Sequence, residues 1–288
     1  QVEMAQLKYR STRLAGLGTT LSRLGGGIGT RGPGEKKLET DRRLIRTRIS
    51  ALKAELAQVE KHRELIRGKR TRGNLKTAAI VGYTNAGKST LLNTLTGAGI
   101  LAEDKLFATL DPTTRVLELK DGQQILLTDT VGFIRKLPHH LVEAFKSTLE
   151  EAKYADIIVH VVDASNPQMD AQMHVVYETL RQLGAEGKPV ITLFNKQDKV
   201  ENPVNHKDLQ ADYSIATSAK TGQGLEEFKH ALLEIIRKEQ IYIERLYDFS
   251  EAGKIQLIRS KGQLLSEEYV PEGIEVKAYV PQDIYGRL

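Results

Sequence analysis

Apolar residues in the first quarter of the chain recur at steps of three, four and seven. The first series has the spacing of one helical face and comprises Leu7, Leu14, Leu17, Leu21 and Leu24. The second keeps strict sevens, widened by Ile49 and Leu56, and comprises Leu38, Ile45, Leu52, Val59 and Ile66. We predict two amphipathic helices packed as an antiparallel hairpin, the first ending near Leu24 and the second beginning near Glu35.

From Leu75 the pattern changes to short apolar runs that alternate with longer amphipathic stretches. Predicted strands cover 78–81, 116–119, 124–128, 157–162, 190–194 and 213–217, and predicted helices cover 88–97, 140–153, 170–183 and 224–238. Such alternation favours an α/β fold with a mainly parallel sheet and helices on both faces. Ligands then bind at the carboxyl ends of the strands.

A small βαββ module is predicted at the end of the chain. Its strands cover 241–249, 264–270 and 274–280, with a helix at 251–262. The module contains no catalytic constellation, so we interpret it as a docking or stabilising element. The expected domains are a basic helical hairpin (1–76), an α/β domain (77–239) and a small α/β domain (240–288).

Composition and charge narrow the classes of protein. The 288 residues include no cysteine, which excludes a disulfide scaffold, and no apolar run approaches membrane-spanning length. We therefore expect a cytoplasmic protein without a membrane span. Residues 1–76 contain 19 basic and 7 acidic side chains, against 23 and 30 in the rest. This asymmetry points to a polyanionic partner for the hairpin. The alternative is a solvated helical face.

The predicted hairpin loop, Gly25–Gly34, contains six glycines in ten positions. Glycine permits close backbone approach to a ligand. Basic residues surround the loop, which suits contact with a phosphate backbone or a folded RNA. A flexible linker is the alternative. The candidate RNA-binding residues are Arg23, Gly27, Thr30, Arg31, Lys36 and Lys37.

The chain contains a phosphate-binding motif, G-x-x-x-x-G-K-S, between a predicted strand and a predicted helix. It reads Gly82-Tyr83-Thr84-Asn85-Ala86-Gly87-Lys88-Ser89, followed by Thr90. Backbone amides and the helix N-terminus would face the phosphates. Lys88 would reach the β- and γ-phosphates, and Ser89 would bind Mg²⁺. A glycine turn that only joins strand to helix is the alternative reading.

A second motif, Asp129-Thr130-Val131-Gly132, follows the predicted strand at 124–128. Asp129 would hold Mg²⁺ through water, and the Gly132 amide would sense the γ-phosphate. The next residue is Phe133, which cannot orient an attacking water as glutamine does. We therefore predict slow intrinsic hydrolysis and a partner that completes the site. Phe133 packing under the loop is an open alternative.

Two further motifs point to guanine. Asn195-Lys196-Gln197-Asp198 follows one predicted strand, and Ser218-Ala219-Lys220 follows the next. The Asp198 carboxylate would accept from the guanine N1–H and exocyclic amine, a donor pair that adenine lacks. Asn195 would brace the loop, and the Lys196 stem would cover the base. The Ala219 amide would donate to guanine O6.

A threonine should close over Mg²⁺ and the γ-phosphate. The stretch Phe107-Ala108-Thr109 supplies Thr109, and Thr113 is the alternative that spacing leaves open. Asn85 resembles the asparagine of potassium-dependent GTPases, which makes K⁺ a candidate second cofactor. His160 is expected in the core, and His139 and His140 are expected to cap or pack, with a relay role left open.

Together these motifs resemble the translation-factor-related GTPases. The Gly25–Glu35 run, the Phe107–Arg115 stretch and Leu137–Phe145 are similar to the HflX family. The resemblance implies a P-loop GTPase that binds the large ribosomal subunit and splits stalled ribosomes under stress, with the hairpin loop near the peptidyl-transferase rRNA. It also implies a further amino-terminal domain, and Ser89 and Thr109 as Mg²⁺ ligands.

We expect GTP and GDP, the large subunit and its rRNA as partners of a monomeric chain. Two alternatives differ in function. One is a large-subunit assembly factor that binds rRNA without splitting ribosomes. The other is an enzyme that uses GTP to drive chemistry on RNA, for which no second catalytic constellation exists.

Overall fold

The computed structural model describes residues 3–4, 6–11, 13, 33–72, 75–97, 113–133, 149–201 and 206–288. The chain divides into two compact units. The first contains residues 1–72, and the second contains 73–135 and 148–288. The three predicted domains remain a prediction, with the hairpin corresponding to the first unit and the other two domains to the second.

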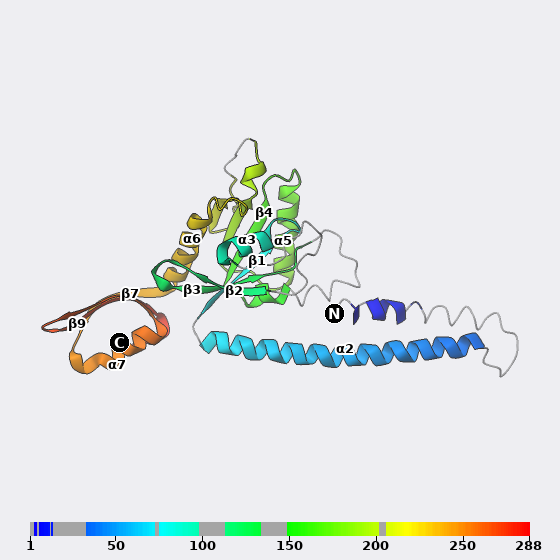
Figure 1. The fold of residues 1–288 in the computed structure, drawn as a ribbon, viewed down its shortest axis with the longest axis horizontal. Helices are drawn as coiled ribbons and strands as arrows, with labels where there is room; N and C mark the ends of the chain where they lie inside the picture. Colours follow the sequence, from blue (N-terminus) through cyan, green and yellow to red (C-terminus); the bar gives the residue numbers. More distant parts are fainter. Residues whose placement is uncertain are drawn as a thin grey trace. The chain divides into compact units, whose positions relative to one another are not determined.

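The first unit contains a 40-residue helix, α2 (Pro33–Arg72), which begins two residues earlier than predicted. The helical residues between 3 and 13 run antiparallel beside it (Figure 1). Arg48 Nε donates to Glu3 Oε1 at 2.9 Å across the two helices. Leu52 is buried on the predicted seam, whereas Val59 is 46% exposed, so the seven-residue series is not buried along its whole length.

The second unit is built on a six-stranded sheet with the order β2-β3-β1-β4-β5-β6. The strands are β1 (Lys76–Gly82), β2 (Thr113–Glu118), β3 (Gln124–Asp129), β4 (Ile157–Asp163), β5 (Val190–Asn195) and β6 (Tyr213–Ala216). Only β2 is antiparallel; it pairs with β3 from Thr113 opposite Asp129 to Glu118 opposite Gln124. This confirms the predicted parallel-dominated α/β sheet.

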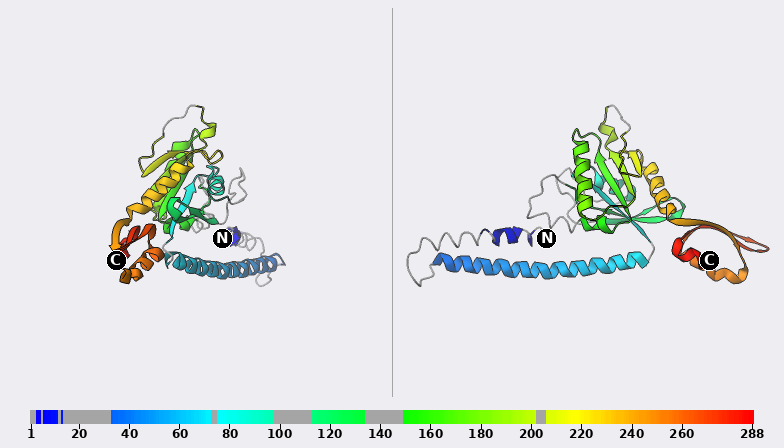
Figure 2. Two further views of the ribbon diagram at one scale, coloured as in Figure 1. Left: turned by 60° about the vertical axis from the view of Figure 1, so that its left-hand side comes forward. Right: turned by 180° about the vertical axis from the view of Figure 1, so that it is seen from behind.

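Helices cover both faces of this sheet, as the two further views show (Figure 2). On one face, α3 (Lys88–Thr96) and α6 (Leu225–Lys238) bury Leu91, Leu92 and Phe228 against alternate residues of the strands. On the other, α5 (Met169–Gln182) buries Val176 and Leu180. The central strands read as continuous apolar runs because both of their faces are buried. Residues 149–154, the described part of the helix predicted at 140–153, are also helical.

Among the described residues of the second unit there are three short 3₁₀ turns, and each follows a sheet strand. These are η1 (Lys120–Gly122), η2 (Gln197–Lys199) and η3 (Phe249–Glu251). The turn η2 contains Asp198 and therefore belongs to the predicted base-recognition motif. At η3, Asp248 accepts from the Ser250 amide at 2.9 Å, which caps the turn before the next helix.

The predicted βαββ module is present after α6. It contains β7 (Gln240–Tyr247), α7 (Ala252–Lys261), β8 (Gln263–Val270) and β9 (Gly273–Pro281), followed by a short helix, α8 (Gln282–Tyr285), that was not predicted. The antiparallel sheet has the order β7-β9-β8. Ile255 and Ile258 of α7 pack against Val276, Ala278 and other residues on one face of the sheet. Within the described residues, no helix is long and apolar enough to cross a membrane.

Candidate nucleotide-binding site

The phosphate-binding motif forms a tight turn between β1 and α3. Gly82 has φ +155°, and a Cβ there would lie 2.2 Å from Val161 O on the neighbouring strand. Gly87 has φ +98° and immediately precedes α3. A side chain at either position would collide or be strained, so glycine is required at both. Asn85 adopts a left-handed conformation with φ 62°. The turn brings backbone amides and the amino-terminal end of α3 together, which is the arrangement that binds phosphate.

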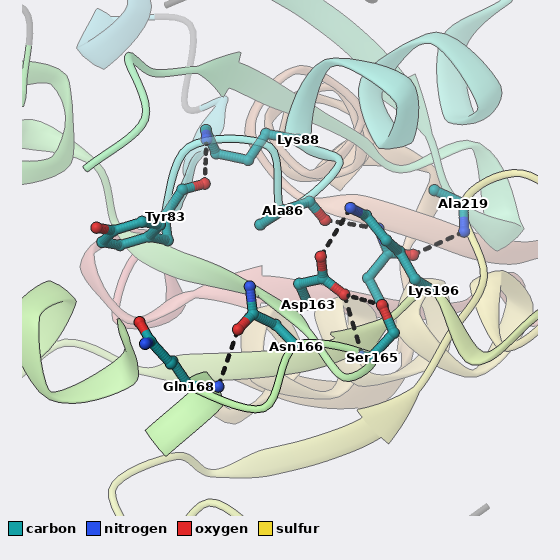
Figure 3. A network of polar contacts seen from close by, with 10 residues as sticks. Tyr83, Ala86, Lys88, Asp163, Ser165, Asn166, Gln168, Lys196 and Ala219 are labelled. Carbon is teal, nitrogen blue, oxygen red and sulfur yellow. Dashed lines mark hydrogen bonds and ion pairs between the residues drawn. The ribbon is translucent and has the colours of Figure 1, made fainter. Parts of the chain in front are cut away.

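Lys88 is 6% exposed and lies inside this turn. Its Nζ donates to Tyr83 O at 3.0 Å and to Gly82 O at 3.2 Å (Figure 3). Burial lowers the pKa of Lys88 from 10.5 to about 8, and the nearby Asp129 carboxylate only partly opposes this. A bound phosphate would supply the negative charge that stabilises the ammonium. The burial of this ammonium in the turn is compatible with an anionic ligand, and the predicted role of Lys88 stays a prediction.

The two predicted Mg²⁺-binding residues that the structure describes are in direct contact. Ser89 Oγ donates to Asp129 Oδ2 at 2.7 Å, and Asp129 is fully buried at the end of β3. A hydroxyl and a carboxylate are the oxygen ligands that Mg²⁺ prefers, with phosphates and water completing its shell. No group of three or more His, Cys, Asp and Glu side chains among the described residues suits a metal.

Residues 129–133 are tied to the phosphate-binding turn by main-chain hydrogen bonds. Phe133 N donates to Gly82 O at 3.0 Å, and Thr84 N donates to Phe133 O at 2.8 Å. A Cβ on Gly132 would lie 2.8 Å from Thr84 Cα and 2.9 Å from Lys88 Nζ, so no larger residue fits. The backbone of this segment is therefore held against the lysine expected to bind the γ-phosphate.

The Phe133 side chain packs in the core beneath α5. It is 4% exposed and belongs to the cluster that contains Val81, Leu149 and Val176. This agrees with the packing alternative. The backbone of Phe133 is hydrogen-bonded to the phosphate-binding turn, and Tyr83 of that turn packs against the cluster that contains the phenyl ring. A phenyl group has no polar atom with which to orient water, so the expectation of slow intrinsic hydrolysis is unchanged.

Asn195 connects the phosphate-binding turn to the loop after β6. Its Nδ2 donates to Ala86 O at 2.8 Å, and its Oδ1 accepts from Ala219 N at 2.8 Å. The side chain is 2% exposed, so both bonds are shielded from water. The bracing role predicted for Asn195 is thereby realised. The Ala219 amide, expected to donate to guanine O6, has Asn195 as its acceptor in this structure.

Asp198 is exposed in η2, three residues after Asn195. Ser218 Oγ donates to Asp198 Oδ1 at 2.7 Å, and this hydrogen bond lowers the pKa of Asp198 from its usual value. The carboxylate is therefore ionised at neutral pH and oriented by one of its two oxygens. The other oxygen can accept from a base. Lys220 is exposed nearby and contributes a weaker electrostatic effect.

Lys196 has a contact that sequence reasoning missed. Its Nζ lies 2.7 Å from Oδ2 of Asp163, the last residue of β4 (Figure 3). Asp163 Oδ1 in turn accepts from Ser165 Oγ at 2.6 Å. The available signal was the carboxylate at the end of a buried strand, because the carboxyl ends of parallel strands share one edge of the sheet.

Several predicted site residues cannot be compared with the structure. Phe107, Ala108, Thr109, His139, His140, Arg23, Gly27, Thr30 and Arg31 lie outside the described residues, and only the backbone is described for Lys36 and Lys37. Thr113 begins β2 in register with Asp129. The choice between Thr109 and Thr113 therefore stays a prediction.

His160 lies in the core, as expected, and outside the nucleotide site. It is 1% exposed, and its Nδ1 lies 4.0 Å from Asp208 Oδ2. Burial lowers the pKa of His160 from 6.5 to about 4, so the ring is neutral at physiological pH. Asp208 also accepts from Tyr177 Oη at 2.5 Å and from Thr192 Oγ1 at 2.6 Å. These contacts hold the segment after η2 against the sheet.

Comparison with known families agrees with this geometry. Residues 77–196 match a family described as "50S ribosome-binding GTPase", and residues 1–70 match one described as "GTP-binding GTPase Middle Region". A GTP-binding protein from the archaeon Sulfolobus solfataricus, solved with GDP, has a similar fold. Its TM-score is 0.53 at 26% identity, over 82% of this chain and 65% of that one.

Relatives in the HflX family resemble the chain along its whole length. GTPase HflX of Lacrimispora saccharolytica is 67% identical over all 288 residues, which correspond to 68% of that relative. GTPase HflX of Escherichia coli is 41% identical over 98% of this chain and 65% of that relative. The chain thus spans about two thirds of the length of these relatives.

The fold and the site define a P-loop GTPase, a class of enzymes that hydrolyse GTP to GDP and phosphate with Mg²⁺ beside the nucleotide. The identities and coverage then place the chain more narrowly. It belongs to the HflX family of GTPases.

We predict that affinity for GDP falls as the pH rises above about 8, the value to which burial lowers the pKa of Lys88. Bound phosphate favours the ammonium, so above this pH binding must take up a proton, and affinity should fall by up to about tenfold per pH unit. Titration with a fluorescent GDP analogue, below the pH at which guanine ionises, measures this. The Lys88→Met variant should bind more weakly without this pH dependence. A constant affinity in the unaltered chain would refute the prediction.

Proposed function

We propose that this chain binds the large ribosomal subunit in its GTP form and dissociates stalled or idle ribosomes under stress. The proposal rests on the presence of two features, a nucleotide site and a strongly basic segment, in the same chain. One is the pre-assembled nucleotide site at the edge of the six-stranded sheet. The other is the strongly basic segment before it, with 19 basic against 7 acidic residues in 1–76. The match of residues 77–196 to a family of ribosome-binding GTPases supports the same partner.

In this proposal, the nucleotide site is a switch. The phosphates bind to the Gly82–Thr90 turn, with Lys88 on the β- and γ-phosphates. Ser89 and Thr109 would hold Mg²⁺ directly, and Asp129 would hold it through water. Phe107 and Ala108 are proposed to belong to the nucleotide site with Thr109, and the backbone of Thr130, Val131 and Gly132 would respond to the γ-phosphate. Hydrolysis relaxes these segments and releases the protein.

A ribosomal partner is expected to complete the hydrolytic site. Phe133 supplies no group that can orient water, and its ring packs in the core. Turnover of GTP by the chain alone should therefore be slow, and contact with the large subunit should accelerate it.

The basic hairpin is proposed to bind rRNA. Arg42 is half-buried, while Arg43, Arg46 and Lys53 are exposed on α2 and suited to phosphate contacts. The hairpin loop would contribute Arg23, Gly27, Thr30, Arg31, Lys36 and Lys37. We propose that the chain is monomeric, because one hairpin and one nucleotide site suffice for this mechanism. We also propose that it is cytoplasmic, where its ribosomal partner is found.

Guanine selectivity is assigned to Asp198, with Ser218 orienting its carboxylate. We predict that Asp198→Asn weakens GDP binding by roughly a hundredfold, because the base's two donors lose a charged acceptor. The variant should also gain affinity for xanthosine diphosphate, whose base carries an oxygen where guanine has the amine. Competition between the two nucleotides measures the change. An unaltered preference for GDP would contradict the assignment.

We propose that K⁺ binds as a second cation near Asn85. This residue belongs to the phosphate-binding turn and has a left-handed backbone conformation. GTP turnover should then be faster in K⁺ than in Na⁺ at equal ionic strength. Equal rates would remove K⁺ from the mechanism.

Ribosome splitting is tested by sedimentation of intact ribosomes incubated with the chain and GTP. We expect separated subunits with the unaltered chain, and intact ribosomes when residues 25–32 are replaced by a short linker. Replacement of exposed Lys207 by Met is a matched control that should leave splitting unchanged. Ribosomes that sediment unaltered with every variant contradict the proposal. Binding to immature large subunits alone would favour the assembly-factor alternative.

A further inference from the structure

A carboxylate outside all four nucleotide-binding motifs is joined to one of them. Asp163 ends β4, in register with Asn195 at the end of β5. Its Oδ2 lies 2.7 Å from Lys196 Nζ, the lysine that follows Asn195 (Figure 3). The backbone supports the same junction, because Ala164 N donates to Asn195 O at 2.9 Å. The end of β4 is therefore attached to the base-recognition loop through both main chain and side chain.

The two carboxylate oxygens of Asp163 have different hydrogen-bond partners. Oδ1 accepts from Ser165 N at 3.1 Å and from Ser165 Oγ at 2.6 Å, while Oδ2 faces Lys196. Ser165 thereby fixes the rotation of the carboxylate and presents the second oxygen to the lysine. A carboxylate held in this way provides a defined position for the ammonium, not merely a negative environment.

The ion pair lies in a largely water-excluded place. The side chains of Lys196 and Asp163 are 17% and 14% exposed. Removal of one partner from a partly buried pair is costly, because the remaining charge is left without compensation. Lys196 also has φ 66°, a backbone conformation that is unfavourable for a residue with a side chain.

The anchored ammonium fixes the course of the lysine's alkyl stem. Lys196 lies between Asn195, which holds the phosphate-binding turn through Ala86, and Asp198, which faces the base. Because the stem is held at its far end, it would form a wall of the base pocket before the nucleotide binds, if the loop binds guanine as proposed. Pre-organisation of this kind lowers the entropy lost on binding.

We propose that Asp163 is a positioning residue for the guanine nucleotide, which acts by fixing Lys196 over the base. This inference rests on the proposed assignment of the Asn195–Asp198 loop to guanine. Loss of the carboxylate should weaken the binding of GDP and of GTP by the same factor, since both nucleotides contain the same base. Its action should also depend on the charge of Lys196, which distinguishes it from a general contribution to folding.

A double-mutant cycle tests this dependence on the full chain. Asp163→Asn and Lys196→Met should each raise the dissociation constant of a fluorescent GDP analogue by roughly tenfold, because each leaves one charge unpaired. The double variant should bind no more weakly than the weaker single variant, because no unpaired charge remains. Asp170→Asn removes the same charge from an exposed position of α5 and should bind like the unaltered chain.

Steady-state kinetics and a second variant separate positioning from folding. For Asp163→Asn, KM for GTP should rise by more than kcat falls, while a structural defect would reduce the active fraction and leave KM unchanged. Ser165→Ala, which removes only the Oγ donor, should weaken GDP in the same direction by a smaller factor. It serves as the decisive variant if Asp163→Asn does not fold.

The possible outcomes distinguish this inference from the function it rests on. Two outcomes would overturn the proposed role of Asp163 and leave the nucleotide assignment intact. One is a double variant whose loss of GDP affinity equals the product of the two single losses, and the other is normal GDP affinity in Asp163→Asn. Failure of the unaltered chain to bind GDP would overturn the proposed nucleotide assignment, and this inference with it.

Discussion

The side-chain amide of Asn195 makes a short connection between two loops that lie far apart in the sequence. It donates to Ala86 in the phosphate-binding turn and accepts from Ala219 after β6, while almost fully buried. A buried amide with both ends satisfied is costly to disturb, because either loop would be left with an unpaired polar group. Asn195 therefore links the phosphate-binding turn directly to the loop after β6, and Thr94 of α3 adds a second link by donating to Ala219 O at 2.7 Å. A Cβ on Gly87 would lie 2.3 Å from Asn195 Nδ2, so glycine is needed for this contact to form.

The order of the strands makes this connection possible. β3, β1, β4 and β5 are adjacent and parallel, so their carboxyl ends deliver Asp129, the phosphate-binding turn, Asp163 and Asn195 to one edge. Main-chain bonds from Phe133 and Thr84 then join the end of β3 to the turn. A change at the γ-phosphate can consequently reach the segment after Gly132, and the base side can remain fixed. In the proposed function, the base side would stay fixed while the phosphate side responds, which suits a nucleotide switch.

Much of this arrangement could be predicted from the sequence, because the motifs have fixed spacing and follow strongly apolar strands. The strand before Gly82 and the helix after Gly87 were located to within two residues, and the bracing role of Asn195 followed from its motif. Asp163 was missed because its partner, Lys196, lies 33 residues later and only the fold brings them together. The acceptor of the Ala219 amide could not be predicted either. The sequence indicates which loops meet, but not that the amide donates to Asn195 Oδ1 when the expected acceptor was guanine O6. Val59 fits the helical repeat and is nevertheless exposed, because a repeat does not specify where its partner helix lies.

The most direct test of the account is GTP turnover by this chain with and without purified large ribosomal subunits. We expect slow hydrolysis by the chain alone, because Phe133 cannot orient water, and a marked acceleration when subunits are added. Small subunits at the same concentration provide the control and should have no such effect. Rapid hydrolysis by the chain alone, or no response to large subunits, would contradict a site that requires the ribosome for its completion.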